Sequence, residues 1–343
     1  MDVGIMQPRV VGRSGITTSA LGMGCWAIGG PWDFNGRPAG WSRTDDDESV
    51  RALRRARELG VTLFDTAANY GAGHSERLLG RAFAGHRDEV LIATKFGYAV
   101  DEPSRSVRHY DAVEDDGDVA ARLRDDLAAS LRRLGTDHVH VLLLHVFGLS
   151  VERALEAAAV LEELVAEGSV RTYGWSTDRT DAVAAFAVGP GCGVVEQGLS
   201  VLDEEDGSLL RLCGERDLAS LIRGPLGMGL LTGKFGATSS FAADDHRAHA
   251  AWHPGFRDGH PTAEWLQRLD AVREVLRGGG RTLAQGALAW LWARSERTIP
   301  IPGFRTVAQV EENAGALAFG PLTVGQLDEI DALLGRSTPG RAA

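Results

Sequence analysis

Four polar residues occupy positions from which they could carry out proton transfer together. Asp65, Lys95 and His145 each come directly after a short apolar run, as residues at the end of a buried strand do. Tyr70 lies five positions after Asp65, in a stretch rich in small residues. A carboxylate, an ammonium, an imidazole and a phenol that converge predict general acid catalysis on a substrate oxygen.

The acidity of the phenol decides whether this chemistry is feasible. A free tyrosine has a pKa of about 10 and donates a proton poorly near neutrality. An ammonium about 4 Å away would favour tyrosinate by about 4 kcal/mol at an effective dielectric of ~20. That corresponds to on the order of 3 pKa units before desolvation opposes it. We therefore predict that Asp65 keeps Lys95 charged, that Lys95 lowers the pKa of Tyr70, and that His145 orients a substrate carbonyl.

The proposed chemistry needs a second agent. A phenol that protonates a carbonyl oxygen implies that a hydride reaches the carbon, so a nicotinamide site is expected. A structural alternative stays open, because Asp65 and Lys95 could be a buried ion pair without a catalytic role. His145 alone could equally be a core histidine. The presence of Tyr70 and His145 at matching positions favours the catalytic interpretation.

Lysine is rare in this chain. Of its 36 basic residues, only Lys95 and Lys234 are lysines, and all the others are arginines. A GC-rich genome would explain the bias. A lysine that persists against it is expected where a compact, titratable ammonium is required.

The elements that must position these residues alternate between short apolar strands and amphipathic helices. Strands are expected at 21–23, 61–64, 90–94, 139–144, 170–175, 194–199, 218–223 and 298–301. Helices are expected after a Thr44 cap up to Gly60 and near 75–83, 118–134, 151–167, 180–187, 208–215, 262–276, 282–294 and 307–314. Eight such units predict a (β/α)8 TIM barrel that forms one domain over residues 1–343.

Further features refine this α/β prediction. A doubly wound sheet would need a G-x-G-x-x-G segment after the first strand, and residues 22–30 lack that spacing. Residues 10–21 predict an N-terminal β-hairpin that plugs the barrel floor. The long polar loops 97–117 and 233–261 follow the third and seventh strands, so they would lie at the C-terminal face of the strands, where barrel active sites form.

Composition excludes several other classes of protein. The net charge of −11 argues against a nucleic-acid surface. The longest apolar run, residues 139–149, is too short to cross a bilayer, and the N-terminus shows no secretory signal. The three cysteines form no C-x-x-C pair. We expect a cytoplasmic protein without membrane or nucleic-acid partners, and we leave a homo-oligomer open.

The segment FDTAANYGAGHSERLLG, residues 64–80, resembles the signature of the aldo-keto reductase family. The similarity extends in order over about residues 9 to 335 and is closest to a bacterial branch that resembles potassium-channel β-subunits. The other matching segments are GMGCWAIGG, ATKFG, LLLHVF, GWSTD, GPLGMGLLTGKF and IPIPGFRTVAQVEENAGAL.

The resemblance implies an NADP-dependent oxidoreductase with a TIM barrel that holds NADPH in extended form. It would reduce an aldehyde or ketone, or oxidise an alcohol or lactol. Carried over by position, Asp65, Tyr70, Lys95 and His145 form the catalytic tetrad, with Tyr70 as the general acid.

The resemblance also implies a cofactor site along the loops that follow the strands. Ser176 would bind the nicotinamide carboxamide, and Arg305 would bind the 2′-phosphate near a helix N-terminus. The other implied cofactor contacts are Gly24, Cys25, Trp26, Thr177, Glu196, Gly224, Pro225, Leu226, Gly229, Leu231, Lys234, Gly303, Gln309 and Asn313. Trp26 and Trp32 are expected to border the substrate, although tryptophans in a long loop can equally form its own small core.

Two positions depart from the family pattern. Thr177 stands where the family often has asparagine. Glu196 aligns with a glutamine of the sixth strand, and Gln197 follows it. A shift by one residue would place Gln197 on the opposite face of the strand, so which of the two contacts the nicotinamide is left open.

Two rival functions stay open. One is a regulatory subunit that binds the cofactor with little turnover. The other is a metal-dependent barrel hydrolase, which would need an H-x-H where Cys25 and Trp26 stand. His138 and His140 form such a pair only near the start of the fourth strand, and the histidines of the loop 233–261 are expected in a substrate lid. We predict no metal site, and the physiological substrate is not predicted.

Overall fold

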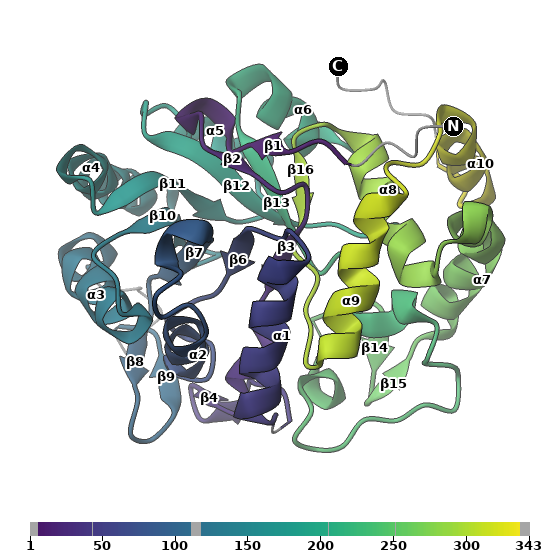
Figure 1. The fold of residues 1–343 in the computed structure, drawn as a ribbon, viewed down its shortest axis with the longest axis horizontal. Helices are drawn as coiled ribbons and strands as arrows, with labels where there is room; N and C mark the ends of the chain where they lie inside the picture. The colour runs from purple at the N-terminus through teal and green to yellow at the C-terminus, as the bar shows by residue number, and fades with distance from the viewer. Residues whose placement is uncertain (1–5, 43, 111–117, 205, 251, 337–343) are drawn as a thin grey trace.

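The computed structural model describes residues 6–42, 44–110, 118–204, 206–250 and 252–336 and centres on a parallel eight-stranded sheet (Figure 1). In sheet order, its strands are β3 (Gly22–Gly24), β6 (Leu63–Asp65), β7 (Leu91–Phe96), β10 (Val139–Leu144), β11 (Val170–Ser176), β12 (Cys192–Gly198), β13 (Ala219–Arg223) and β16 (Thr298–Pro300). A parallel bridge between Gly24 and Gly303 joins the first strand to the last. The predicted (β/α)8 barrel is confirmed.

A glycine is needed where the barrel closes. The Gly24 amide donates to the Pro302 carbonyl at 3.0 Å. A Cβ on Gly24 would lie only 2.6 Å from the Ile301 carbonyl oxygen, so a side chain there would force the two strands apart.

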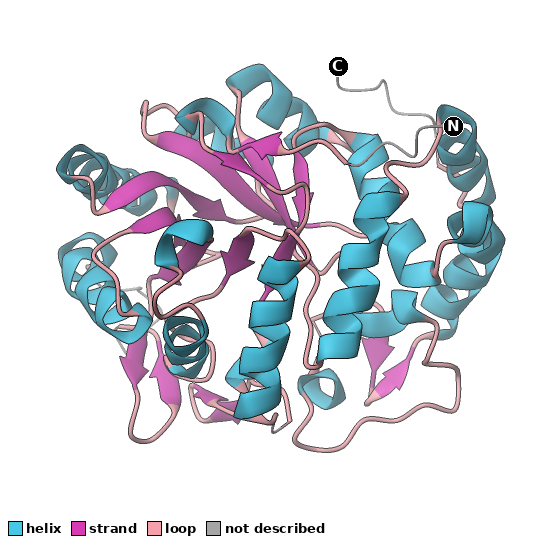
Figure 2. Ribbon diagram, viewed as in Figure 1, coloured by secondary structure: helices cyan, strands magenta, loops and turns pink. Residues whose placement is uncertain are grey.

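Helices surround the sheet on its outer side (Figure 2). They are α1 (Asp46–Glu58), α2 (His74–Ala82), α3 (Val119–Leu134), α4 (Val151–Glu167), α5 (Thr180–Phe186), α6 (Ser208–Arg216), α7 (Ala263–Arg277), α8 (Leu283–Arg294), α9 (Val307–Gly315) and α10 (Val324–Leu333). The sequence did not predict α10. The cap of α1 was predicted wrongly, because Asp45 accepts the Glu48 amide while the Thr44 hydroxyl donates to the Ile28 carbonyl. None of these helices in the described residues is long and apolar enough to cross a membrane.

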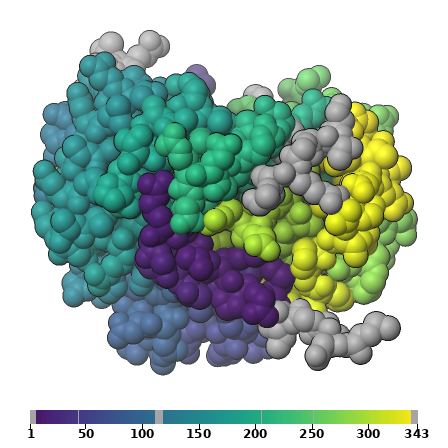
Figure 3. Space-filling view, turned by 90° about the horizontal axis from the view of Figure 1, so that it is seen from above, coloured from purple at the N-terminus to yellow at the C-terminus, as the bar shows by residue number. Residues whose placement is uncertain are grey.

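The N-terminal hairpin covers one end of the barrel, as predicted. Strands β1 (Arg9–Val10) and β2 (Thr17–Thr18) pair antiparallel, and Figure 3 shows this N-terminal segment lying across the molecule. Between them Val11 is fully buried among the side chains that fill the barrel. Gly12 lies so close to the floor that a Cβ would meet the Gly193 carbonyl oxygen at 2.2 Å.

Two small sheets lie at the opposite end, where the long loops were predicted (Figure 1). One consists of β4 (Asp33–Phe34), β5 (Arg37–Pro38), β8 (Ala99–Asp101) and β9 (Ser106–Arg108), and the other of β14 (Phe256–Arg257) and β15 (His260–Pro261). The first ties the loop after β3 to the loop after β7. The remainder of the predicted loop 97–117 beyond residue 110 lies outside the described residues.

Candidate active site

Three neighbouring strands bring the predicted polar residues to one end of the barrel. Asp65 is the last residue of β6, Lys95 lies near the end of β7, and His145 directly follows β10. Leu63, two positions before Asp65, belongs to the cluster that fills the barrel. The residues two positions before Lys95 and His145 belong to the same cluster, so strand alternation turns all three polar side chains inward.

Lys95 is the centre of a buried charged cluster. Its Nζ donates to Asp65 Oδ1 at 2.6 Å and to the Thr66 carbonyl at 3.0 Å. Glu196 Oε2 lies 3.2 Å from the same nitrogen. The side chains of Lys95, Asp65 and Glu196 are all at most 3 % exposed. Two carboxylates therefore share one ammonium away from water.

The electrostatics of this cluster follow from burial and from the excess of acid. Burial and repulsion from Glu196 raise the pKa of Asp65 well above its usual range, against the opposing effect of Lys95. Burial alone would lower the pKa of Lys95, but attraction to Asp65 and Glu196 outweighs it, so that pKa rises. The raised pKa of Asp65 and the raised pKa of Lys95 both agree with a charged lysine, one carboxylate and one protonated carboxyl group.

Tyr70 and His145 lie above this cluster. Lys95 Nζ is 5.1 Å from the centre of the Tyr70 ring, and the Tyr70 and His145 ring centres are 5.9 Å apart at 79°. Burial, then repulsion from Lys95 and Arg223, lowers the pKa of His145 well below its usual value, so the imidazole is neutral. Its Nδ1 is buried without a hydrogen-bond partner among the described residues.

The predicted effect of Lys95 on the phenol needs correction. Lys95 does favour tyrosinate, but burial has the larger effect and raises the pKa of Tyr70 above its ordinary value. Asp65 and Glu196 raise it further, because their negative charges offset the ammonium. The prediction from one ammonium gave burial too little weight and left out the negative charges of Asp65 and Glu196. In this structure Tyr70 is a neutral phenol that holds its proton firmly.

The structure shows which of the two adjacent residues on β12 faces the barrel. Glu196 lies opposite Ser176 of β11, and the Ser176 hydroxyl donates to Glu196 Oε1 at 3.0 Å. Gln197 points to the outer side, where its amide donates to Ser220 Oγ at 2.7 Å. Glu196 Oε2 makes no hydrogen bond among the described residues, although Lys95 is close. This buried oxygen beside Ser176, whose charged contact is Lys95, could also accept from a ligand that carries an N–H donor.

A cluster of cations forms a second part of the site. Burial, then repulsion from Arg247 and Arg305, lowers the pKa of Lys234. The Arg305 amide donates to Gln309 Oε1 at 2.7 Å, at the start of α9. Arg247 is itself paired with Asp245, whose Oδ1 and Oδ2 accept from it at 2.8 and 2.7 Å. Lys234 and Arg305 are therefore the cations of this cluster that fit an anionic ligand such as a phosphate. Arg247 was not predicted from the sequence.

Other predicted cofactor residues are spread along the same rim. Ser176 and Thr177 are buried at the end of β11. The predicted pyrophosphate segment forms a kinked 3-10 helix over Gly227–Thr232, in which Gly229 has φ of +98°. Leu231 is fully buried in the core, so only its backbone could face a ligand.

Aromatic rings cover the phenol. Trp26 stacks on Tyr70 with ring centres 6.1 Å apart, and Trp41 meets Trp26 edge-on at 5.4 Å. His246, from the loop after β13, lies 4.7 Å from Trp26, which agrees with the predicted lid. Trp32 instead packs with Ala72 and Val107 under the small sheet, as the small-core alternative expected, and we leave it out of the substrate site.

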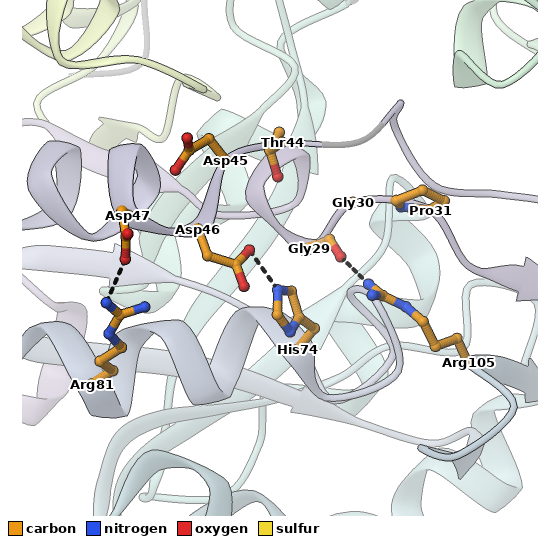
Figure 4. Close-up of a pocket in the computed structure, with 10 residues that line it drawn as sticks. All are labelled: Gly29, Gly30, Pro31, Thr44, Asp45, Asp46, Asp47, His74, Arg81 and Arg105. Carbon is orange, nitrogen blue, oxygen red and sulfur yellow. Dashed lines mark hydrogen bonds and ion pairs between the residues drawn. The ribbon is translucent and has the colours of Figure 1, made fainter.

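A separate pocket of about 850 Å³ lies behind the Tyr70 loop (Figure 4). Its charged groups are paired within the chain, as the drawn contacts show: Asp46 with His74, Asp47 with Arg81, and Arg105 with the Gly29 carbonyl. Gly29, one of the lining residues, packs against the backbone of Tyr70, so this wall of the pocket also supports the Tyr70 loop. We do not assign a ligand to it.

Comparison with known proteins identifies the family. The model of the Aldo/keto reductase family matches residues 20–334. The chain belongs to this family. As an aldo-keto reductase it is an oxidoreductase of carbonyl compounds, which confirms the function predicted from the sequence.

Three relatives illustrate how this aldo-keto reductase compares with others. It is 29 % identical to the aldo-keto reductase yakc [NADP(+)] of Schizosaccharomyces pombe, with 88 % of this chain and 84 % of the relative covered. It is 27 % identical to the NADH-specific methylglyoxal reductase of Escherichia coli, with 91 % and 94 % covered. The structure of the glycerol dehydrogenase AKR11B4 from Gluconobacter oxydans matches with a TM-score of 0.77 and 27 % identity, over 99 % of this chain and 98 % of the other.

Proposed function

We propose that this aldo-keto reductase is an NADP-dependent enzyme that reduces an aldehyde or ketone, or oxidises the corresponding alcohol or lactol. The observation that carries the proposal is the buried contact of Lys95 with Asp65, directly below Tyr70 and His145. We also propose that the chain is one barrel domain that acts in the cytoplasm, with a homo-oligomer left open.

The residues present suit a dinucleotide phosphate. Lys234 and Arg305 would hold its phosphates, because an anion would relieve the repulsion that Lys234 feels from Arg305 and Arg247. Ser176 and Glu196 Oε2 would hold a carboxamide at the other end. When bound, the nicotinamide would supply a hydride to the carbonyl carbon.

Residues of the chain itself would orient the substrate oxygen and protonate it. His145 is neutral and presents a ring nitrogen, so it would orient the carbonyl by a hydrogen bond. Tyr70 would give its proton to the oxygen as negative charge develops there, because its raised pKa keeps it protonated until that moment. Trp26 and His246 would exclude water from the site.

The preference for NADP rests on the cationic cluster. The relatives differ by name in their nicotinamide cofactor, so the family does not settle the choice. Arg305 at the start of α9, with Lys234 and Arg247 close by, is suited to a 2′-phosphate that NADH lacks.

A substrate panel tests the function. Purified protein would be mixed with NADPH and a set of aldehydes, keto-sugars and, with NADP⁺, lactols, while the nicotinamide absorbance is followed. Steady turnover with at least one compound supports an enzyme. Tight NADPH binding with no turnover on any of them would favour a regulatory subunit that merely binds the cofactor.

A further inference from the structure

The active site carries one more acidic group than its lysine can neutralise. Asp65 Oδ1 and Glu196 Oε2 lie 2.6 and 3.2 Å from Lys95 Nζ, and all three side chains are shielded from water. With both carboxyl groups ionised the cluster has a net charge of −1, and with one of them protonated it is neutral. A glutamine at position 196 carries no charge, so the cluster would have no surplus acidic group.

This surplus charge lies where the proposed function places the nicotinamide. Glu196 Oε1 accepts from Ser176, the residue proposed to bind the carboxamide, and the buried Oε2 faces Lys95. The nicotinamide ring is cationic in NADP⁺ and neutral in NADPH. A nearby negative charge therefore discriminates between the two forms, whereas the phosphates are common to both.

We propose that Glu196 makes this site favour the oxidised cofactor over the reduced one, and that binding of the oxidised form releases a proton from the Asp65–Glu196 pair. The inference rests on the proposed function, because it requires NADP to bind beside Ser176. It biases the bound couple toward NADP⁺, which favours oxidation of an alcohol over reduction of a carbonyl.

The titratable groups around Asp65 and Glu196, other than Lys95, are held in their neutral forms. Burial raises the pKa of Cys25 well above its usual value, with Asp65 as a further cause, and burial raises that of Tyr70. His145 is neutral because its pKa is lowered. From β13, the residue level with Glu196 is the apolar Leu221. Lys95 is thus the charged partner that the Asp65 and Glu196 side chains share.

The sign of the pH dependence follows from linkage. A cationic ring stabilises the ionised pair and lowers its pKa, so NADP⁺ binding releases a proton and strengthens as pH rises. NADPH has a neutral ring, so the ionised Asp65–Glu196 pair does not strengthen its binding and weakens it slightly. The ratio of the NADPH to the NADP⁺ dissociation constant should therefore increase with pH. Titration of the shared 2′-phosphate cancels in this ratio.

The experiment is a binding titration without turnover. Dissociation constants for NADP⁺ and NADPH would be measured by tryptophan fluorescence from about pH 6 to about pH 9, for the wild type and for Glu196→Gln and Glu196→Asp. The wild-type ratio should rise about tenfold over this range, as expected for one unit charge at short distance in a partly shielded site. Glu196→Asp should keep the rise, and Glu196→Gln should abolish it.

The outcomes separate this inference from the proposed function. If both nucleotides bind but the wild-type ratio is constant with pH, or Glu196→Gln retains the wild-type rise, Glu196 does not set the preference and the inference is wrong, while the cofactor site stands. If neither nucleotide binds to the wild type, the proposed function fails and the inference fails with it. A loss of folding in Glu196→Gln leaves the wild-type profile and Glu196→Asp as the decisive measurements.

Discussion

The Glu48 carboxylate of α1 accepts a hydrogen bond from the backbone amide of Val307, at the first turn of α9, with a distance of 2.8 Å. A negative charge from a distant part of the chain therefore already occupies one donor of the helix N-terminus that was expected to attract a phosphate. Arg305 stands two residues earlier. The site that we propose for the 2′-phosphate thus combines a favourable cation with an unfavourable anion.

Glu48→Gln should strengthen NADPH binding by roughly two- to fivefold while leaving NADH nearly unchanged. The amide oxygen can still accept from Val307, so the change removes the repulsive charge and keeps the helix cap. Fluorescence titration of both cofactors measures the effect. Asp47→Asn is the matched control, because Asp47 also lies on α1 but pairs with Arg81. Equal effects of the two substitutions would show that long-range charge, and not the contact with α9, is responsible.

Arg305→Ala should weaken NADPH by roughly ten- to a hundredfold and NADH much less. A charge-assisted hydrogen bond to phosphate has this magnitude. Arg297→Ala serves as a control, because Arg297 pairs with Asp217 near the start of β13, at the other end of the barrel. Equal weakening of NADPH and NADH would mean that Arg305 binds the part of the dinucleotide that they share.

Lys95→Arg should reduce kcat severely even though the charge is kept. A planar guanidinium cannot take the place of a compact ammonium between Asp65 and Glu196, where all three side chains are at most 3 % exposed. Lys234→Arg is the matched control, since Lys234 is exposed and its proposed role needs only a cation. Steady-state kinetics compares the two variants. A kcat close to that of the wild type in Lys95→Arg would overturn the argument from the rarity of lysine.

The buried, neutral His145 should make the protein less stable in mild acid. Its folded-state pKa lies well below the unfolded value, so this contribution to stability is complete above about pH 6.5 and is lost as pH falls below it. His145→Asn should therefore lose less unfolding free energy than the wild type between about pH 7 and about pH 5. Urea unfolding measures this, with the surface substitution His249→Asn as a control. An equal loss in His145→Asn and the wild type would contradict a neutral buried imidazole.

Residues on strands could be placed from their periodicity, whereas a loop residue could be placed only where a motif contained it, as for Tyr70. The period of two along a strand was enough to turn Asp65 and Lys95 inward, and the same rule places Glu196 inside and Gln197 outside once the strand register is known. Arg247 comes from a long loop without periodicity, and its position depends on packing against Trp41 and neighbouring rings. Nothing in the local sequence signals that contact.

Effects that depend on several groups at once were also beyond the sequence. The pKa of Tyr70 was predicted from one ammonium, but burial and the second carboxylate decide its direction. Contacts between distant segments, such as Glu48 with α9, had no local signal either. The small sheet around Trp32 was not predicted, because its strands have only two or three residues each.

The Tyr70→Phe variant tests the proposed catalytic arrangement most directly. The Tyr70 ring lies between Lys95 and Trp26, and removal of its hydroxyl leaves the ring contact with Trp26 in place. The NADPH dissociation constant and the single-turnover rate of carbonyl reduction would be measured on the same preparation. We predict unchanged NADPH affinity and a rate lowered by roughly a hundred- to ten-thousandfold, as for loss of a general acid. A rate close to that of the wild type, or a loss of affinity equal to the loss of rate, would contradict the role of Tyr70 as proton donor.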